Sequence, residues 1–234
     1  MNPTQFLESC DVDSAVSDLR PDYVCVLVAA TGLGTKAPTS AIDVLVRDAE
    51  QHATALLEDT PVAEILHLAS WRSAFQSFGA KPSDYKSSAE ALMRRAPKGL
   101  PRINALTDVY NALSVLHAVP IGGENMAAYR GGARLMRALG SEPFDTVVGG
   151  EPVIEHPKPG EVVWCDDAGV TCRRWNWRQG QRTQLTADTT DVLFILDTLQ
   201  PLGDTEREAL VTDLVTWLEL LGGTEVATRT MARV

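Results

Sequence analysis

Residues 71–125 read WRSAFQSFGAKPSDYKSSAEALMRRAPKGLPRINALTDVYNALSVLHAVPIGGEN, and this stretch decides the fold. Its apolar spacing predicts the end of a helix over 62–78, a short helix capped near Ser87, and a longer helix over 105–118. A Gly-Gly pair follows the last helix. The stretch is therefore expected to be helical, with one glycine-containing turn at its end.

The segments on either side add β-structure. Residues 22–30 form a Val-rich apolar run that predicts a buried strand, and residues 40–59 have helical spacing. After Ala127 the segments become short, β-branched or aromatic, and 190–199 again predicts a buried strand. A helix is expected over 204–222. We expect one α/β (α+β) domain over the whole chain, with an N-terminal strand and helix in residues 1–60.

Composition limits the environment and the partners. The chain has 234 residues, 44% of them hydrophobic, and a formal net charge of −10. It lacks a run of about 18 apolar residues and a basic-then-apolar start, so we expect a cytoplasmic protein without a membrane partner. An acidic surface repels nucleic acid, so DNA is not an expected partner and a local basic patch marks where an anion docks.

Cysteines and histidines give no sign of a metal site. The four cysteines form no CxxC pair and the four histidines show no ligand spacing, so neither a metal nor a cofactor is expected. Cys165 and Cys172 would face each other in a hairpin that turns at Ala168-Gly169, whereas a three-residue turn would break that register. Two packed free thiols are the expectation in a reducing compartment.

Two basic patches stand out against the acidic background. The first contains Arg94, Arg95, Lys98 and Arg102 beside Asn104, and the second contains Arg173, Arg174, Arg178 and Arg182 around Trp175, Asn176 and Trp177. If RRWNWR is a strand, Arg174 and Asn176 share one face, and Arg173 shares the other with the two Trp side chains. Such a face suits a stacked base beside a phosphate. The alternative is a core strand whose Arg residues brace loops.

Polar residues also recur on the helix over 105–118 and just after it. Asp108 and Asn111 are three residues apart, so they share a helix face, and Asn104 lies in the preceding turn. They are candidates for binding a carbonyl or ribose hydroxyl, with capping and loop bracing as the alternative. Gly122 and Gly123 are candidates for an oxyanion pocket of backbone N–H groups, or else they form a simple tight turn. Glu124 is either a base that holds a water or a solvated loop residue.

Four sequence motifs resemble those of the B3/B4 domain of the phenylalanyl-tRNA synthetase β subunit, and they resemble those of its freestanding relatives most closely. They are SxEALxRR, LPxINxLTDxYN, PIGGEN and CRRWNWR, and the likeness covers residues 70–200. The resemblance implies a three-layer β-sandwich of unusual topology surrounded by helices. It matches Asp108 and Asn111 to an Asp and an Asn of the family. It also implies that two polar groups of the synthetase pocket, a His and a Glu, are replaced near Gly122 and Trp177, so the amino acid that is recognised should differ.

That domain removes wrongly attached amino acids from tRNA, so the resemblance implies an aminoacyl-tRNA deacylase that acts in trans on the aminoacylated 3′ end. Asp108, Asn111, Gly122, Gly123 and Glu124 would form its catalytic site. The tRNA-binding residues would be Arg94, Arg95, Asn104, Arg173, Arg174, Trp175, Asn176 and Trp177. Two alternatives are a non-catalytic RNA-binding module and a protein that binds a small amino acid or ester.

Overall fold

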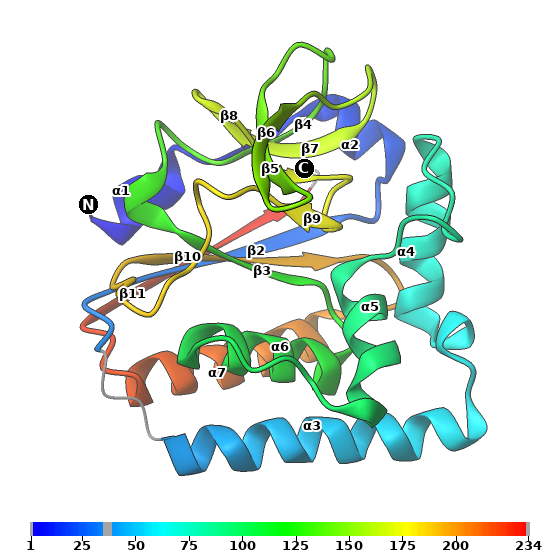
Figure 1. Cartoon of the computed structure of the whole chain (residues 1–234), viewed down its shortest axis with the longest axis vertical. Coiled ribbons are helices and arrows are strands. Elements are labelled where there is room, and N and C mark those ends of the chain that lie inside the picture. Colours follow the sequence, from blue (N-terminus) through cyan, green and yellow to red (C-terminus); the bar gives the residue numbers. More distant parts are fainter. Residues whose placement is uncertain (1, 35–38, 233–234) are drawn as a thin grey trace.

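Two stacked β-sheets form the centre of the computed structural model, which describes residues 2–34 and 39–232 (Figure 1). The first sheet has the strand order β11-β2-β10-β3, with the bounds Glu225–Ala232, Val24–Thr31, Val192–Thr198 and Ile121–Asn125. The second has the order β1-β4-β7-β8-β9, with the bounds Asp11–Val12, Arg134–Arg137, Val162–Asp166, Gly169–Arg173 and Arg178–Gln179. The helices are α1 Pro3–Glu8, α2 Ser14–Leu19, α3 Thr39–Asp59, α4 Leu66–Ser77, α5 Ser88–Arg95, α6 Ala105–His117 and α7 Asp204–Leu220.

The two central strands of the first sheet, β2 and β10, are buried on both faces. Val28 and Phe194 point into one apolar cluster, on the side of the helices, whereas Leu27 and Ile195 point into a second cluster toward the other sheet. Successive side chains of a strand alternate between faces, so a strand covered on both sides must be apolar throughout. This is why both segments read as continuous apolar runs in the sequence.

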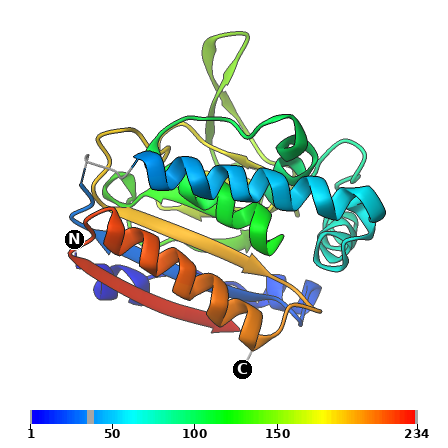
Figure 2. The same cartoon turned by 90° about the horizontal axis from the view of Figure 1, so that it is seen from below.

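Helices α3, α6 and α7 cover the outer face of the first sheet (Figure 2). Helix α6 begins where the Asn104 side chain accepts a hydrogen bond from the Thr107 N–H, and it ends at Ala118 in a left-handed conformation. Helix α7 buries Leu210, Leu214 and Leu218 against the same core. None of the helices in the described residues has the length and apolarity needed to cross a membrane.

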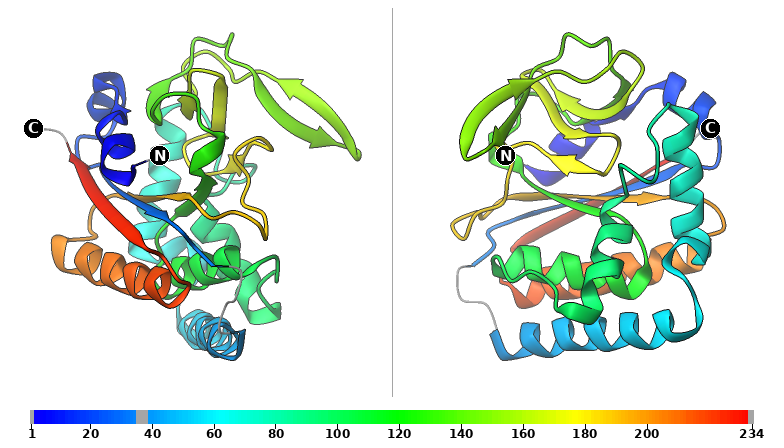
Figure 3. Two further views of the ribbon diagram at one scale, coloured as in Figure 1. Left: turned by 90° about the vertical axis from the view of Figure 1, so that its left-hand side faces the viewer. Right: turned by 45° about the vertical axis from the view of Figure 1, so that its right-hand side comes forward.

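A two-stranded hairpin, β5 (Phe144–Val148) with β6 (Glu151–Glu155), projects from the second sheet (Figure 3). Its turn is Gly149-Gly150, and both glycines have positive φ, 62° and 90°. Two-residue turns of this kind match the twist of the strands, and glycine adopts them without steric cost. The base of the hairpin contacts the loop that follows β9 through the Asp145 carboxylate, which accepts from the Arg182 N–H at 2.6 Å.

The mixed class and the main helices agree with the sequence analysis. Counted through the molecule, the layers are helices, the four-stranded sheet and the five-stranded sheet (Figure 1). The helix expected over 62–78 is interrupted at Ile65, which has an extended backbone, so a short 3-10 turn over Val62–Glu64 precedes α4. The N-terminal region contains α1, β1 and α2 in addition to the expected strand and helix.

Two local predictions are wrong. RRWNWR is not a strand, because Arg174 and Trp175 have positive φ and the segment turns between β8 and β9. The Gly122-Gly123 pair lies inside strand β3 and does not form a turn. The hairpin of β7 and β8 turns at Asp167-Ala168 and not at Ala168-Gly169, so Cys165 pairs with Val170, and a bulge between Trp164 and Cys165 places Cys172 opposite Trp164. The four cysteines are free thiols, as expected.

Candidate functional site

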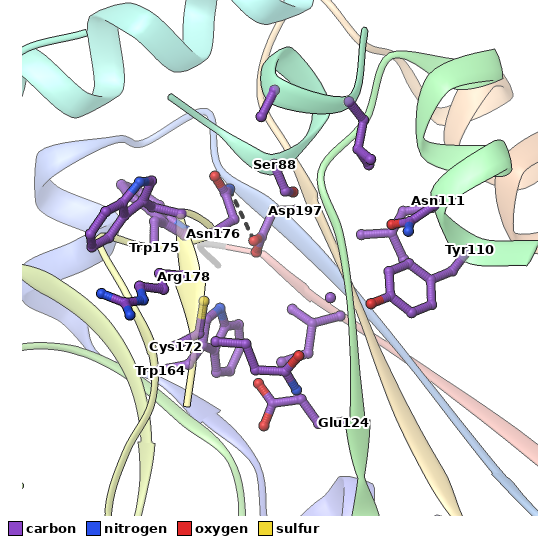
Figure 4. A pocket seen from close by; sticks show the side chains of 17 residues that line it. Ser88, Tyr110, Asn111, Glu124, Trp164, Cys172, Trp175, Asn176, Arg178 and Asp197 are labelled. Carbon is purple, nitrogen blue, oxygen red and sulfur yellow. Dashed lines mark hydrogen bonds between the residues drawn. The ribbon is translucent and has the colours of Figure 1, made fainter. Parts of the chain in front are cut away.

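A pocket of about 270 Å³ lies where strands β3 and β10 of the first sheet face strands β7 to β9 of the second. Helices α5 and α6 close its remaining sides (Figure 4). Most of the lining is apolar or aromatic, from side chains such as Trp164, Trp175, Ile195 and Tyr110. The polar and charged side chains in the lining are Ser88, Asn111, Glu124, Cys172, Asn176, Trp177, Arg178, Gln179 and Asp197. A concave, largely apolar cavity with a few converging polar groups is the usual form of a small-molecule site.

Glu124 is one of two carboxyl groups in this pocket. It is 2% exposed and accepts a hydrogen bond from the Tyr129 hydroxyl at 2.6 Å. Burial raises the pKa of Glu124 to about 7, although the Tyr129 hydrogen bond and the charge of Arg182 oppose the shift. The alternative of a solvated loop glutamate is therefore wrong for this residue.

Asp197, near the end of β10, is the second carboxyl group. It is 2% exposed; its Oδ1 accepts from the Tyr23 hydroxyl at 2.5 Å and its Oδ2 accepts from the Asn176 amide at 3.1 Å. Burial raises the pKa of Asp197 to about 7, and the negative charge of Glu124 adds to the shift, while the two hydrogen bonds oppose it. Two carboxyl groups that ionise near neutral pH thus lie in one pocket.

The register of β3 and β10 explains the placement of both groups. Gly122 pairs with Ile195, so Gly122 and Glu124 on β3 share a sheet face with Ile195 and Asp197 on β10. A Cβ on Gly122 would find its nearest neighbour, Ile195, at 3.9 Å, so this glycine leaves open space at the pocket floor. A Cβ on Gly123 would lie 2.7 Å from the Tyr110 ring, so Gly123 permits the close approach of α6 to the sheet.

These positions correct the expected roles of the two glycines. Gly122 and Gly123 pair with β10 and provide no turn in which N–H groups converge on a ligand, so the oxyanion-turn geometry is not present. Gly122 lines the pocket through its missing side chain instead.

The two candidate residues on helix α6, Asp108 and Asn111, do not lie in the same site. Asn111 lines the pocket, next to Tyr110. Asp108 lies on another side of the helix, where its carboxylate accepts from Arg102 Nε and from the Ile103 N–H, both at 2.8 Å. Asn104 caps the helix through the Thr107 N–H at 2.9 Å. The alternative of capping and loop bracing therefore describes Asp108 and Asn104, and neither lines the pocket.

The second basic patch is largely internal. Arg173 is 5% exposed and forms a two-point ion pair with Glu161, at 2.8 and 2.9 Å, and a further pair with Glu155 at 2.7 Å. Arg174 lies over the rings of Tyr85 and Trp177, at 3.8 and 4.4 Å from their centroids. Its burial lowers the pKa of the guanidinium. Both side chains brace the turn after β8, which is unfavourable for the predicted contacts with phosphate.

The two tryptophans between β8 and β9 differ in how deeply they are buried. Trp175 is fully buried, edge to face with Trp71 and Tyr23 at centroid distances of 5.2 and 5.0 Å, so it is a core residue that cannot stack on an adenine. Trp177 is half-buried and packs on Tyr85, with their ring centroids 5.0 Å apart.

The arginines of the first basic patch lie outside the pocket lining. Arg94 binds Glu90 at 2.8 Å and Arg95 donates to the Gly99 carbonyl, and both arginine side chains are exposed.

The sequence analysis overlooked Asp197, Gln179 and Tyr129. The signal for Asp197 was a single acidic residue inside an otherwise apolar strand, VLFILDT, because a charge is rarely placed in a buried strand without a role. Gln179 donates to the Gly123 carbonyl at 2.9 Å and lines the pocket. Its sequence position gives no such signal, since β9 has only two residues.

Thiol and metal chemistry find little support in this pocket. Cys172 lines it, but burial raises the pKa of this thiol well above its ordinary value, and the charges of Glu124 and Asp197 add to the shift. The thiol therefore stays protonated near neutral pH and is a poor nucleophile. In residues 2–34 and 39–232, no group of three His, Cys, Asp or Glu side chains is arranged to hold a metal ion.

Comparison with known proteins adds the family. Residues 70–215 match the family model described as the B3/4 domain. The chain belongs to this family. No curated protein sequence matches it. An N-terminal fragment of the phenylalanyl-tRNA synthetase β-subunit from Pyrococcus horikoshii is similar in structure, with 12% identity and a TM-score of 0.45. The match covers 96% of this chain and 54% of that fragment, so the chain spans about half the length of the fragment.

All pocket-lining residues, from Ser88 to Asp197, fall inside the matched B3/4 segment. One supporting group comes from outside it, since Tyr23 precedes β2 and donates to Asp197. The B3/4 segment of this chain therefore builds the pocket wall, and the N-terminal region helps to hold one of its two carboxyl groups.

Proposed function

We propose that this B3/4 protein hydrolyses the ester bond of an aminoacyl-tRNA in trans, with the aminoacyl group seated in the pocket between the two sheets. The observation that carries the proposal is that pocket itself. Its volume of about 270 Å³ suits one amino-acid residue, and Glu124 and Asp197, each with a pKa of about 7, face the floor made by Gly122 and Ile195. The family resemblance to an editing domain gives the substrate class.

The chemistry follows from the carboxyl group of Glu124. A general base works best when its pKa is near the working pH, and a carboxyl group with a pKa of about 7 is half ionised there. The ionised Glu124 takes a proton from a water as the water oxygen bonds to the ester carbonyl carbon. The bond from that carbon to the ribose oxygen then breaks, and the ribose oxygen receives the proton. Asn111, across the pocket, is a candidate donor to the carbonyl oxygen.

Contact with the tRNA should be confined to its acceptor end. Arg178 lines the pocket, donates to the Val147 carbonyl at 3.1 Å and lies over the Trp177 ring, so it is a candidate for the terminal phosphate or ribose. A chain with a net charge of −10 offers little else to a polyanion.

The test is a panel of charged tRNAs incubated with the purified full chain. At least one should be deacylated well above its spontaneous rate, and Glu124→Gln should lower that rate by about 100-fold, the lower range for a positioned base. Gly122→Ala should also lower the activity, because the added methyl group lies at the pocket floor, where its nearest neighbour, Ile195, is 3.9 Å away. Glu142→Gln is the matched control, since this carboxylate caps the Leu139 and Gly140 N–H groups and does not line the pocket. If no charged tRNA is deacylated above background, the proposed reaction is wrong.

One observation favours a second candidate, a protein that binds an amino acid or a small ester without RNA. Arg173, in the patch expected to contact RNA, is committed to internal carboxylates, and the same holds for Arg182, which pairs with Asp166 at 2.7 Å. Salt dependence separates the two candidates. Binding of charged tRNA should weaken steeply as salt rises if phosphates are contacted, whereas binding of a small amino acid should change little.

A further inference from the structure

The pocket lining contains buried polar groups that have no hydrogen-bond partner among the described residues: the indole N–H groups of Trp164 and Trp175, and two groups at the Asp197 end that can accept. Because Asn176 donates its amide to Asp197, its own Oδ1 points elsewhere; that oxygen is buried and has no partner among the described residues. The hydroxyl of Ser88 is likewise buried and has no hydrogen-bond partner in residues 2–34 and 39–232. Ser88 and Asn176 are neighbours, since the Ser88 N–H donates to the Asn176 carbonyl at 3.0 Å (Figure 4). An unmatched buried polar group is unfavourable, so such a cluster is well suited to a ligand that supplies donors.

The charge at this end also lacks a counterion. Within the described part of the chain, no Lys, Arg or His side chain forms an ion pair with Asp197 or with Glu124, although both carboxyl groups are 2% exposed. The lining includes one cation, Arg178, whose guanidinium is directed to the Val147 carbonyl and the Trp177 ring. A buried carboxylate without a cation attracts a positive ligand strongly, because the surroundings screen the charge poorly.

We infer that Asp197, Asn176 and Ser88 form a subsite for the side-chain ammonium of a basic amino acid such as lysine or ornithine. The inference deepens the proposed function and rests on it for the orientation of the ligand. An ammonium group has three donors and no acceptor, which matches one carboxylate, one amide oxygen and one hydroxyl.

The spacing of the two carboxyl groups supports a side-chain rather than an α-ammonium. Glu124 pairs with Leu193, and Asp197 lies four residues further along β10, which places the two backbone positions about 13 Å apart along the strand. The reacting ester lies at the Glu124 end in the proposed function. The Asp197 end therefore meets the far end of the amino-acid side chain, and the apolar stem crosses the floor at Gly122 and Ile195.

The ionisation of Asp197 gives an independent reason for pH-dependent binding. The groups around it are Glu124 from β3, Tyr23 before β2, Cys25 from β2, Trp164 from β7, Cys172 from β8, Asn176 after β8 and, on the lining, Arg178 from β9. Its pKa of about 7 reflects burial without a cation. A bound ammonium favours the ionised form, so affinity should rise up to tenfold per pH unit below pH 7 and level off above it.

The experiment uses the full chain and four amides that cannot be hydrolysed as esters: lysinamide, Nα-acetyl-lysinamide, norleucinamide and Nα-acetyl-norleucinamide. Titration calorimetry at pH 7.5 should show both lysine amides binding at least tenfold more tightly than their norleucine counterparts. Asp197→Asn should reduce the affinity for lysinamide to that for norleucinamide. Ser88→Ala should weaken it about threefold to tenfold, and it leaves the helix cap intact because Ser87 is the cap of α5. Glu142→Gln is the matched control, in which the preference for lysinamide persists, because this carboxylate caps the Leu139 and Gly140 N–H groups outside the pocket lining.

Two results would overturn the inference. Equal binding of lysinamide and norleucinamide would show that no side-chain ammonium is recognised, and binding of norleucinamide without binding of Nα-acetyl-lysinamide would assign the subsite to the α-ammonium. Failure of the proposed function would look different. The lysine preference would then be present while lysyl-tRNA, like every other charged tRNA, is not hydrolysed above background. Hydrolysis of a charged tRNA without any lysine preference would leave the reaction standing and remove the subsite.

Discussion

Two buried clusters of charge on neighbouring parts of the fold are built on opposite principles. In the first, Arg173 is enclosed by Glu161 and Glu155, so every charge has a partner. In the second, Asp197 and Glu124 are equally buried but are held only by hydroxyl and amide groups. Paired charges hold a turn in place, whereas unpaired charges of one sign make a site that a cation completes. Arg173 of the basic segment therefore has a structural role, whereas Asp197, the acidic residue in an apolar strand, lines the pocket.

The largest effect should come from breaking the paired cluster. Arg173→Ala leaves Glu161 buried without its partner, which should cost about 3–5 kcal/mol in the free energy of unfolding. Urea denaturation at pH 7 measures this loss directly. Arg134→Ala is the matched control, because the Arg134–Asp167 pair is exposed on both sides and should contribute little. A loss for Arg173→Ala as small as that of the control would contradict the structural role of the cluster.

A smaller effect on the free energy of unfolding is expected from the unpaired cluster, because its two buried carboxyl groups lack a cation. The pKa values of Asp197 and Glu124 in the folded chain, both about 7, lie above those of an unfolded chain, so the folded state holds more protons between about pH 4 and 7. Their contribution to stability is present below pH 4 and is lost as the pH rises through 7. Between pH 5.5 and 8 the free energy of unfolding should fall by roughly 2–4 kcal/mol from this source. The double variant Asp197→Asn, Glu124→Gln should show a flatter profile; a wild-type profile parallel to it would contradict the shifted values.

Local sequence patterns predicted the helices and strands more accurately than they predicted the contacts between distant segments. Helix α6 with its Asn104 cap, helix α7 and the buried strands β2 and β10 follow from capping residues and apolar spacing, which act within one segment. The turn in RRWNWR does not, because the positive φ values of Arg174 and Trp175 are fixed by packing against other parts of the fold.

The same limit applies to the candidate site. Six of the residues predicted from the sequence line one pocket: Asn111, Gly122, Glu124, Trp175, Asn176 and Trp177. The partners of Arg173 could not be foreseen, since Glu161 and Glu155 lie on other segments and only the three-dimensional fold brings them together. Asp197 was predicted only as part of a buried strand, because its charge in an apolar run does not indicate which cavity or partner the residue faces.

The most direct test of the unpaired cluster is a carbon-13 NMR titration of the Asp197 and Glu124 carboxyl groups, assigned with Asp197→Asn and Glu124→Gln. Without ligand, both groups should titrate near pH 7, and saturating lysinamide should lower the pKa of Asp197 by more than one unit, because the ammonium favours the carboxylate. Norleucinamide should leave Asp197 near its starting value. Titration of both groups near pH 4 in the free protein, or an Asp197 pKa that lysinamide does not change, would contradict the account.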